Sequence, residues 1–315
     1  MSDKERVLIF ANPIAGRGRG RRIAERLRAR LEADSFDVDL FLERPDCFDL
    51  AGLHRPPRAA IVIGGDGTLR GVAHRLFLDP CPVSPEGRTS PDAPPPTDPP
   101  LLIVPLGTAN LMGRHLGIRW NERTLADQVA AAVARRNVVR IDTARANGRL
   151  FLLMAGVGFD AHVVHALDRM RSGPIKLTSY VAPAISALTG YQFPPLRVVV
   201  DGHEVFGPEP GIVFVGNLPE YGTGFPVLPH ARADDGVLDV CALPCRSPAD
   251  LVGLFLLAAT GQHLQADGVV YLKGKHVKIT APSGAPVPIQ VDGDPAGHTP
   301  TEIYLLPIRL PFIVP

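Results

Sequence analysis

The chain has 315 residues, of which 45% are hydrophobic and 21% are charged, and its formal net charge is +1. This size and mixture predict a globular protein of two domains and exclude a disordered chain, while the balanced charge argues against a nucleic-acid binder that works by bulk electrostatics. The N-terminal sequence lacks the apolar stretch of a signal peptide, and no run reaches the roughly 18 apolar residues of a membrane-spanning helix, so we expect a cytoplasmic protein.

The first part of the chain alternates predicted strands, glycine-containing loops and helices. Apolar runs predict buried strands at residues 6–12, 36–42, 59–63 and 101–105. Apolar residues at helical spacing predict helices over 21–33 and after residue 68. Thr124 and Asp127 form a T-x-x-D capping box, which predicts a third helix through Arg136. Strand, loop and helix repeated in this way predict a parallel sheet covered on both faces.

The pattern changes after about Ile141 to short strands joined by Gly/Pro turns, which is typical of an antiparallel sandwich. We expect these strands at 150–155, 196–206, 211–216, 237–243, 269–272, 276–280, 287–292 and 301–305. Two apolar helices are expected among them, over 174–190 and 248–264. Either helix could present an apolar surface, and packing as core is the alternative for both.

The sequence therefore predicts an α/β domain with a parallel sheet over 1–141 and a mainly antiparallel β-sandwich domain over 142–305. The last residues, 306–315, could return to the first domain. Between residues 79 and 100 there are nine prolines and almost no large apolar residues, so this insert is predicted to be a flexible surface loop.

Three glycine-containing loops follow predicted strands: NPIAGRGRG at 12–20, GGDGT at 64–68 and PLGTAN at 105–110. In open α/β sheets, ligands bind at the carboxyl ends of the strands, where glycines let the backbone approach a phosphate and a helix N-terminus adds partial positive charge. Asp66 cannot face a bare phosphate favourably, so it should act through Mg²⁺ or orient its loop. An ordinary Asp-Gly turn at 64–68 and a flexible turn at 12–20 are the alternatives.

The motifs NPIAGRG, GGDGTL and PLGTANLMGRHLGI, in this order and spacing, resemble the diacylglycerol kinase catalytic domain family, which includes bacterial lipid kinases and eukaryotic sphingosine and ceramide kinases. The resemblance runs from about Arg6 to Pro315, apart from the insert. It implies a lipid kinase that uses ATP and Mg²⁺ and phosphorylates a lipid hydroxyl in a cleft between two domains. Such an enzyme would be peripheral to the membrane and contact its surface transiently.

The resemblance also implies the site residues. On the nucleotide side they are Asn12, Pro13, Arg17, Arg22, Gly64, Gly65, Asp66, Gly67, Thr68, Gly107, Thr108 and Asn110. Asp294 would be the base that accepts the lipid hydroxyl proton, with Asp142 behind it at a position linked to Mg²⁺ and water. Asp234, Asp235 and the Leu238 carbonyl resemble a second Mg²⁺ site. Phosphoryl transfer uses such residue types, because cations spread the phosphate charge and a carboxylate orients the attacking hydroxyl. A plain turn or capping role stays open for Asp142, Asp234, Asp235 and Asp294.

Two positions depart from the family pattern. Leu111 stands where Asp is commoner after GTAN, and Asp294 stands where Glu usually follows VDG. Asp is one methylene shorter than Glu, and a misplacement of ~1 Å can cost ~100-fold in rate. Two alternatives therefore stay open: an NAD kinase, from a related family that shares GGDGT, and a catalytically weak nucleotide- or lipid-binding regulator. The sequence does not identify the lipid and leaves a homodimer open.

Overall fold

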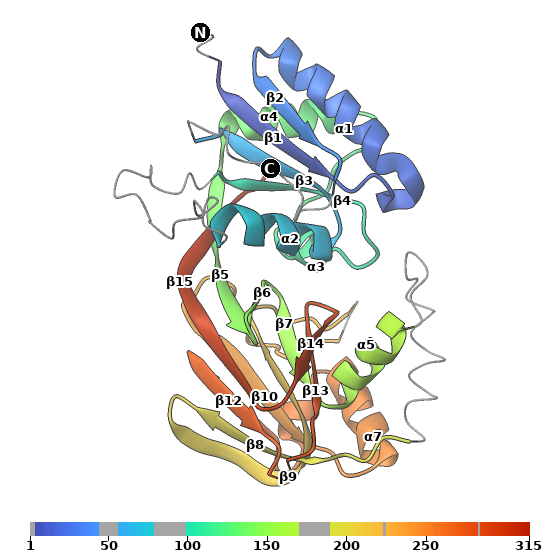
Figure 1. Ribbon diagram of the computed structural model, residues 1–315, viewed down its shortest axis with the longest axis vertical. Coiled ribbons are helices and arrows are strands. Elements are labelled where there is room, and N and C mark those ends of the chain that lie inside the picture. The colour runs from blue at the N-terminus through green and yellow to red at the C-terminus, as the bar shows by residue number, and fades with distance from the viewer. Residues whose placement is uncertain (1–3, 44–55, 79–98, 170–189, 223–224, 283) are drawn as a thin grey trace, which may run out of the picture. The chain divides into compact units, whose positions relative to one another are not determined.

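The computed structural model describes residues 4–43, 56–78, 99–169, 190–222, 225–282 and 284–315 (Figure 1). The chain divides into two compact units: unit 1 is Met1–Ile141 with Leu310–Pro315, and unit 2 is Asp142–Arg309. Residues 79–98 of the predicted insert, and the predicted helix over 174–190 apart from Gly190, lie outside the described residues.

Unit 1 is a parallel sheet with helices on both faces. Its strands are β1 (Arg6–Ala11), β2 (Asp37–Phe41), β3 (Ala59–Gly64), β4 (Leu101–Pro105) and the last residues of β15 (Thr301–Ile313), in the order β2-β1-β3-β4-β15. Its helices are α1 (Ala15–Ala33), α2 (Asp66–Phe77), α3 (Leu111–His115) and α4 (Leu125–Arg135). Figure 1 shows α1 and α4 on one face of the sheet and α2 and α3 on the other.

Side chains of the central strands are buried on both faces of this sheet. In β1, Val7 and Ile9 pack with residues of α1 and α4, while Leu8 and Phe10 alternate with them and are equally buried. A strand covered on both sides has no solvent face, so its sequence is a continuous apolar run. This is why the predicted strands of unit 1 are found within one or two residues of their expected bounds.

Two local predictions for unit 1 are wrong. The predicted loop over 12–20 is short, because α1 already begins at Ala15. Gly20 allows this early start, since a Cβ there would lie 2.2 Å from the Asn12 carbonyl oxygen. The capping box is not formed: Thr124 precedes α4 without a side-chain hydrogen bond to it, and Asp127 Oδ1 instead lies 2.7 Å from Arg30 Nε of α1.

Unit 2 is an antiparallel β-sandwich. Its strands are most of β5 (Val138–Ala146), β6 (Arg149–Phe151), β7 (Met154–Val157), β8 (Pro195–Val200), β9 (His203–Gly216), β10 (Leu238–Pro244), β11 (Val270–Gly274), β12 (His276–Thr280), β13 (Pro288–Val291), β14 (Asp294–His298) and the first part of β15. The long β9 belongs to both sheets, because residues 203–210 pair with β8 and residues 211–216 with β10. Inward side chains of the two sheets share one apolar core. The predicted fold class is confirmed.

Several elements of unit 2 differ from expectation. The strand predicted over 150–155 is two strands, β6 and β7, and the strand predicted over 301–305 continues as β15 to Ile313. The strand predicted over 196–206 is a hairpin, since Asp201 and Gly202 turn with φ of 47° and 87°, as a two-residue hairpin loop requires. The helix predicted over 248–264 is α7 (Pro248–Ala259), followed by the short η3 (His263–Gln265). A helix not predicted, α5 (Phe159–Arg169), packs against β13.

Candidate functional site

Three loops come together at the carboxyl edge of the unit 1 sheet, because β1, β3 and β4 are parallel neighbours. The Asn12 amide donates to the Ile63 carbonyl at 3.0 Å, and the Leu106 amide donates to the Gly64 carbonyl at 2.8 Å. The loops after β3 and β4 touch backbone to backbone, since a Cβ on Gly107 would lie 2.6 Å from Gly65 Cα. Side chains at these two glycines would therefore separate the loops.

Asp66 holds the loop after β4 in place. Its carboxylate accepts the backbone N–H groups of Leu111 at 3.0 Å and Met112 at 3.2 Å, which are the first residues of α3. Burial raises the pKa of Asp66, and these backbone donors work in the opposite direction. Of the two roles expected for Asp66, the geometry matches the one in which it orients a loop.

Asn110 shapes the same loop from within. It has a left-handed backbone (φ 50°), its Oδ1 accepts the Gly107 N–H at 2.8 Å, and its Nδ2 donates to the Gly107 carbonyl at 2.7 Å. Asparagine tolerates this conformation better than most residues. Leu111 thus holds the loop through its main-chain N–H, which Asp66 binds. The aspartate that is commoner in the family at this position is not needed for that contact.

The other predicted nucleotide residues line the start of α1 and α2. Asn12 Oδ1 accepts the Ile14 N–H at 3.1 Å, with Pro13 between them. A Cβ on Gly64 would lie 2.6 Å from Thr68 Oγ1, so the Thr68 hydroxyl lies over that glycine. The first N–H groups of a helix have no partner within it, and α2 begins at Asp66 beside these loops. Such a helix terminus with glycines around it suits a phosphate.

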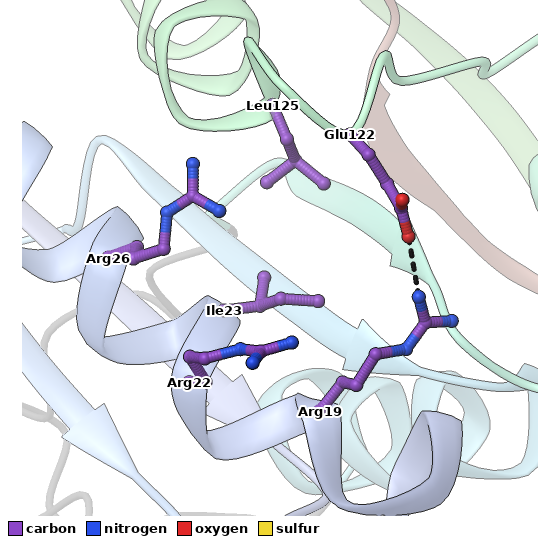
Figure 2. Close-up of a pocket in the computed structure, with 6 residues that line it drawn as sticks. All are labelled: Arg19, Arg22, Ile23, Arg26, Glu122 and Leu125. Atoms are coloured by element: carbon purple, nitrogen blue, oxygen red, sulfur yellow. Dashed lines mark hydrogen bonds and ion pairs between the residues drawn. The ribbon is translucent and has the colours of Figure 1, made fainter.

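Arg22 lies in a pocket between α1 and the start of α4 in unit 1 (Figure 2). The pocket is lined by Arg19, Arg22, Ile23 and Arg26 of α1 and by Glu122 and Leu125. Arg19 Nη1 is paired with Glu122 Oε1 at 2.5 Å, and Arg22 and Arg26 point toward the same space. Residues 64–68 and 105–110 do not line this pocket, and of the 12–20 segment only Arg19 does. The side chain of Arg17 lies outside the described part of the chain.

In unit 2, Asp142 is buried and both of its carboxylate oxygens have partners. Oδ1 lies 2.6 Å from Arg309 Nε, and Oδ2 accepts the Gly236 N–H at 2.7 Å. Arg309 also donates to the Asp234 carbonyl oxygen. Asp142 and Arg309 therefore fix the turn at 234–236, and this carboxylate has protein partners where the family resemblance implied Mg²⁺ and water.

The predicted second metal site holds cationic side chains instead. Asp235 Oδ2 lies 2.7 Å from Lys273 Nζ, and Asp234 Oδ1 lies 3.3 Å from Arg232 Nη2. Leu238 is fully buried at the start of β10. Within the described ranges, no group of three or more His, Cys, Asp or Glu side chains is arranged to hold a metal ion. Asp234 and Asp235 thus each have a cationic partner, and the second Mg²⁺ site stays a prediction.

Asp294 is the first residue of β14 and is half-buried. It follows the tight turn of Asp292 and Gly293, which have φ of 50° and 84°. The Asp292 carboxylate accepts three backbone N–H groups, from Leu152, Leu153 and Met154, at 2.9 to 3.1 Å. The role of Asp292 could not be predicted from the sequence: the Asp-Gly pair marked the turn, but nothing local marked which backbone its carboxylate would bind.

The helix α7 presents an apolar surface in unit 2. It carries one charged residue, Asp250, and buries only Ala258. Val252, Phe255 and Leu256 are 51%, 48% and 65% exposed. Other apolar side chains of the helix contact a buried cluster of unit 2, so the core interpretation holds for one side of α7 only. No described helix is both long and apolar enough to cross a membrane.

Both parts of the chain match known protein families. Residues 6–146 match the diacylglycerol kinase catalytic domain, and residues 154–314 match the YegS C-terminal NAD kinase beta sandwich-like domain. The chain belongs to the diacylglycerol kinase family. A diacylglycerol kinase of Mycobacterium tuberculosis is 28% identical, with 98% of this chain and 95% of that protein aligned. One of Staphylococcus carnosus is 26% identical, with 96% and 93% aligned.

The fold agrees with solved structures of this family. Two Bacillus anthracis crystal structures assigned to diacylglycerol kinases cover 100% of this chain and 97% and 98% of theirs, with TM-scores of 0.71 and 0.66. They are 24% and 21% identical to it. The family resemblance predicted from the motifs is confirmed, and with it lipid kinase function at the level of the family.

Proposed function

We propose that this protein is an ATP-dependent lipid kinase that transfers the γ-phosphate to a hydroxyl of a diacylglycerol-like lipid. The observation that carries the proposal is the meeting of the loops after β3 and β4 at the N-terminus of α2, in a chain of this family. Unit 1 would bind the nucleotide, and unit 2 would supply the carboxylate base and the lipid-binding surface.

The nucleotide phosphates would lie on the backbone of residues 64–68 and 107–110, with Asn12 and Pro13 alongside. Support comes from Gly65 and Gly107, whose lack of a Cβ lets the two loops touch backbone to backbone, and from the helix terminus of α2. Arg17 and Arg22 would add positive charge from α1. Phosphoryl transfer of this kind uses Mg²⁺ bound to the phosphates, and the bound nucleotide would bring that ion with it.

Asp294 would accept the proton of the attacking hydroxyl. Support comes from its position: it is half-buried and directly follows a turn whose backbone is tied down by Asp292. A base must be held within hydrogen-bond reach of the proton that it removes. Asp142 is less suited to a direct part because Arg309 and Gly236 occupy its carboxylate.

The enzyme would reach its substrate by lying on the membrane through α7. Support comes from the exposed Val252, Phe255 and Leu256 on a helix with a single charge. An apolar helix face inserted at the headgroup boundary gives reversible binding that scales with the buried apolar area. The protein would then be peripheral to the membrane.

The test is transfer of labelled phosphate from Mg·ATP to a panel of acceptors: diacylglycerol, ceramide, a sphingoid base and phosphatidylglycerol in mixed micelles, and NAD in solution. We expect diacylglycerol-like lipids to be labelled and NAD not. Asp294→Asn should lower kcat by ~100-fold or more with little change in the KM for ATP. Labelling of NAD alone would replace the proposal with an NAD kinase, and ATP binding without any turnover would favour a regulator.

A further inference from the structure

A buried amide connects α5 to the turn that carries Asp294. The Gln290 side chain is 1% exposed. Its Oε1 accepts the Gly293 N–H at 2.8 Å, and its Nε2 donates to Asp160 Oδ2 at 3.2 Å. Since a backbone N–H can only donate, the first bond fixes which end of the amide faces the turn and turns Nε2 toward Asp160.

The neighbouring strand is adapted to this contact. Gln290 of β13 is opposite Gly156 of β7 in the sheet. A Cβ on Gly156 would lie 1.9 Å from Asp160 Oδ2 and 2.8 Å from Gln290 Nε2. The carboxylate and the amide therefore meet in the space that a side chain at position 156 would fill. On the other face of β13, Ile289 and Val291 belong to the sandwich core, so Gln290 is a polar position in an otherwise apolar strand.

Asp160 is an unusual choice for a purely structural partner. It is 8% exposed at the start of α5, and among the described residues its Oδ1 has no hydrogen-bond partner. Burial raises the pKa of this carboxyl from 3.8 to about 7. A buried carboxylate with one free oxygen destabilises a fold, and such groups concentrate where geometry serves function.

The turn at 292–293 is thus held from two directions. Asp292 ties it to the backbone of residues 152–154, and Gln290 ties Gly293 to α5 through Asp160. A second contact, between His165 Nε2 and the Ile289 carbonyl at 2.8 Å, fixes α5 on β13 one turn further along the helix. Asp294 is the next residue after this doubly held turn.

We propose that Gln290, anchored by Asp160, is a positioning residue for the Asp294 carboxylate. This inference rests on the proposed role of Asp294 as the base. Because Asp294 is one methylene shorter than the glutamate usual in the family, its reach depends more strongly on where the turn holds its backbone. Loss of a positioning contact that shifts a reacting group by ~1 Å lowers the rate by ~100-fold.

A double-mutant cycle tests the inference on the full-length enzyme. Gln290→Met keeps the size of the side chain and removes both hydrogen bonds. We expect it to lower kcat by ~10- to 100-fold with the KM for ATP unchanged, and to have less than a ~2-fold further effect when Asp294→Asn is already present, because residues that act through one group are not additive. Equal effects in both backgrounds would overturn the inference, as would a normal kcat for Gln290→Met.

Thr299→Val is the matched control. Thr299 Oγ1 accepts the Val287 N–H at 3.1 Å at the open end of the same hairpin, so this variant also removes a buried hydrogen bond but leaves the turn alone. It should melt at a reduced temperature with an unchanged kcat. If Gln290→Met does not fold, Gln290→Asn keeps the amide with a shorter reach and carries the same expectation. A normal kcat for Asp294→Asn would remove both the base assignment and this inference, whereas a normal kcat for Gln290→Met alone removes only the inference.

Discussion

Replacing Asp66 tests whether the loop after β4 is held by one side chain from α2. The two carboxylate oxygens of Asp66 accept two N–H groups, those of Leu111 and Met112. Asp66→Asn preserves the shape of the side chain but leaves only one acceptor oxygen. The new NH₂ group faces the other backbone donor. A buried N–H without a partner costs about 1–3 kcal/mol. We take about 2 kcal/mol, which in a domain of this size lowers the Tm by roughly 4–8 °C.

The assays are thermal unfolding by circular dichroism and the kinase rate as a function of ATP concentration. If the 107–110 loop carries the phosphates, kcat/KM for ATP should fall by ~10-fold or more along with the Tm. Asp127→Asn is the matched control in unit 1, because Asp127 is an exposed acid whose pairing with Arg30 contributes little. A wild-type Tm for Asp66→Asn would refute the capping argument. A lowered Tm with normal use of ATP would keep the capping role and remove the loop from the nucleotide site.

Asp160→Asn should flatten the pH dependence of stability: burial raises the pKa of Asp160 from 3.8 to about 7, so between these values the folded protein keeps a proton that the unfolded chain has released, and stability falls as pH rises. At ~1.4 kcal/mol per pH unit, this group should lower the free energy of unfolding of the wild type by about 3 kcal/mol between pH 5 and 8, which urea unfolding can measure. If the free energy of unfolding of Asp160→Asn falls with pH as steeply as that of the wild type, the raised pKa does not belong to Asp160. Val252→Ser with Leu256→Ser should weaken binding to diacylglycerol-containing vesicles by ~10-fold or more in cosedimentation, because each side chain loses part of its apolar contact with the bilayer. Tyr304→Ser removes another exposed large side chain, outside α7, and should bind like the wild type; equal losses for both would argue against α7 as the membrane-contact surface.

The elements of unit 1 could be predicted from the sequence because their signals are local. The apolar runs of β1, β3 and β4 reflect strands buried on both faces, and the glycines that follow mark where each strand ends. The change to short strands with Gly/Pro turns likewise marked unit 2 as a sandwich. Local signals failed where a tertiary contact outweighed them: α1 extends back to Ala15 across three glycines, and Asp127 binds Arg30 instead of capping its own helix.

The partners of the site carboxylates were decided by the tertiary structure alone. Asp66 was recognisable as a site residue in GGDGT, yet its partners lie 45 and 46 positions further along the chain. Asp142 pairs with Arg309, 167 positions away, and Asp235 with Lys273, so two implied metal ligands are bound by cations. A carboxylate in a sequence carries the same charge whatever it binds. Only the fold determines which donor reaches it first, because burial makes an unpaired charge costly and so requires a nearby partner.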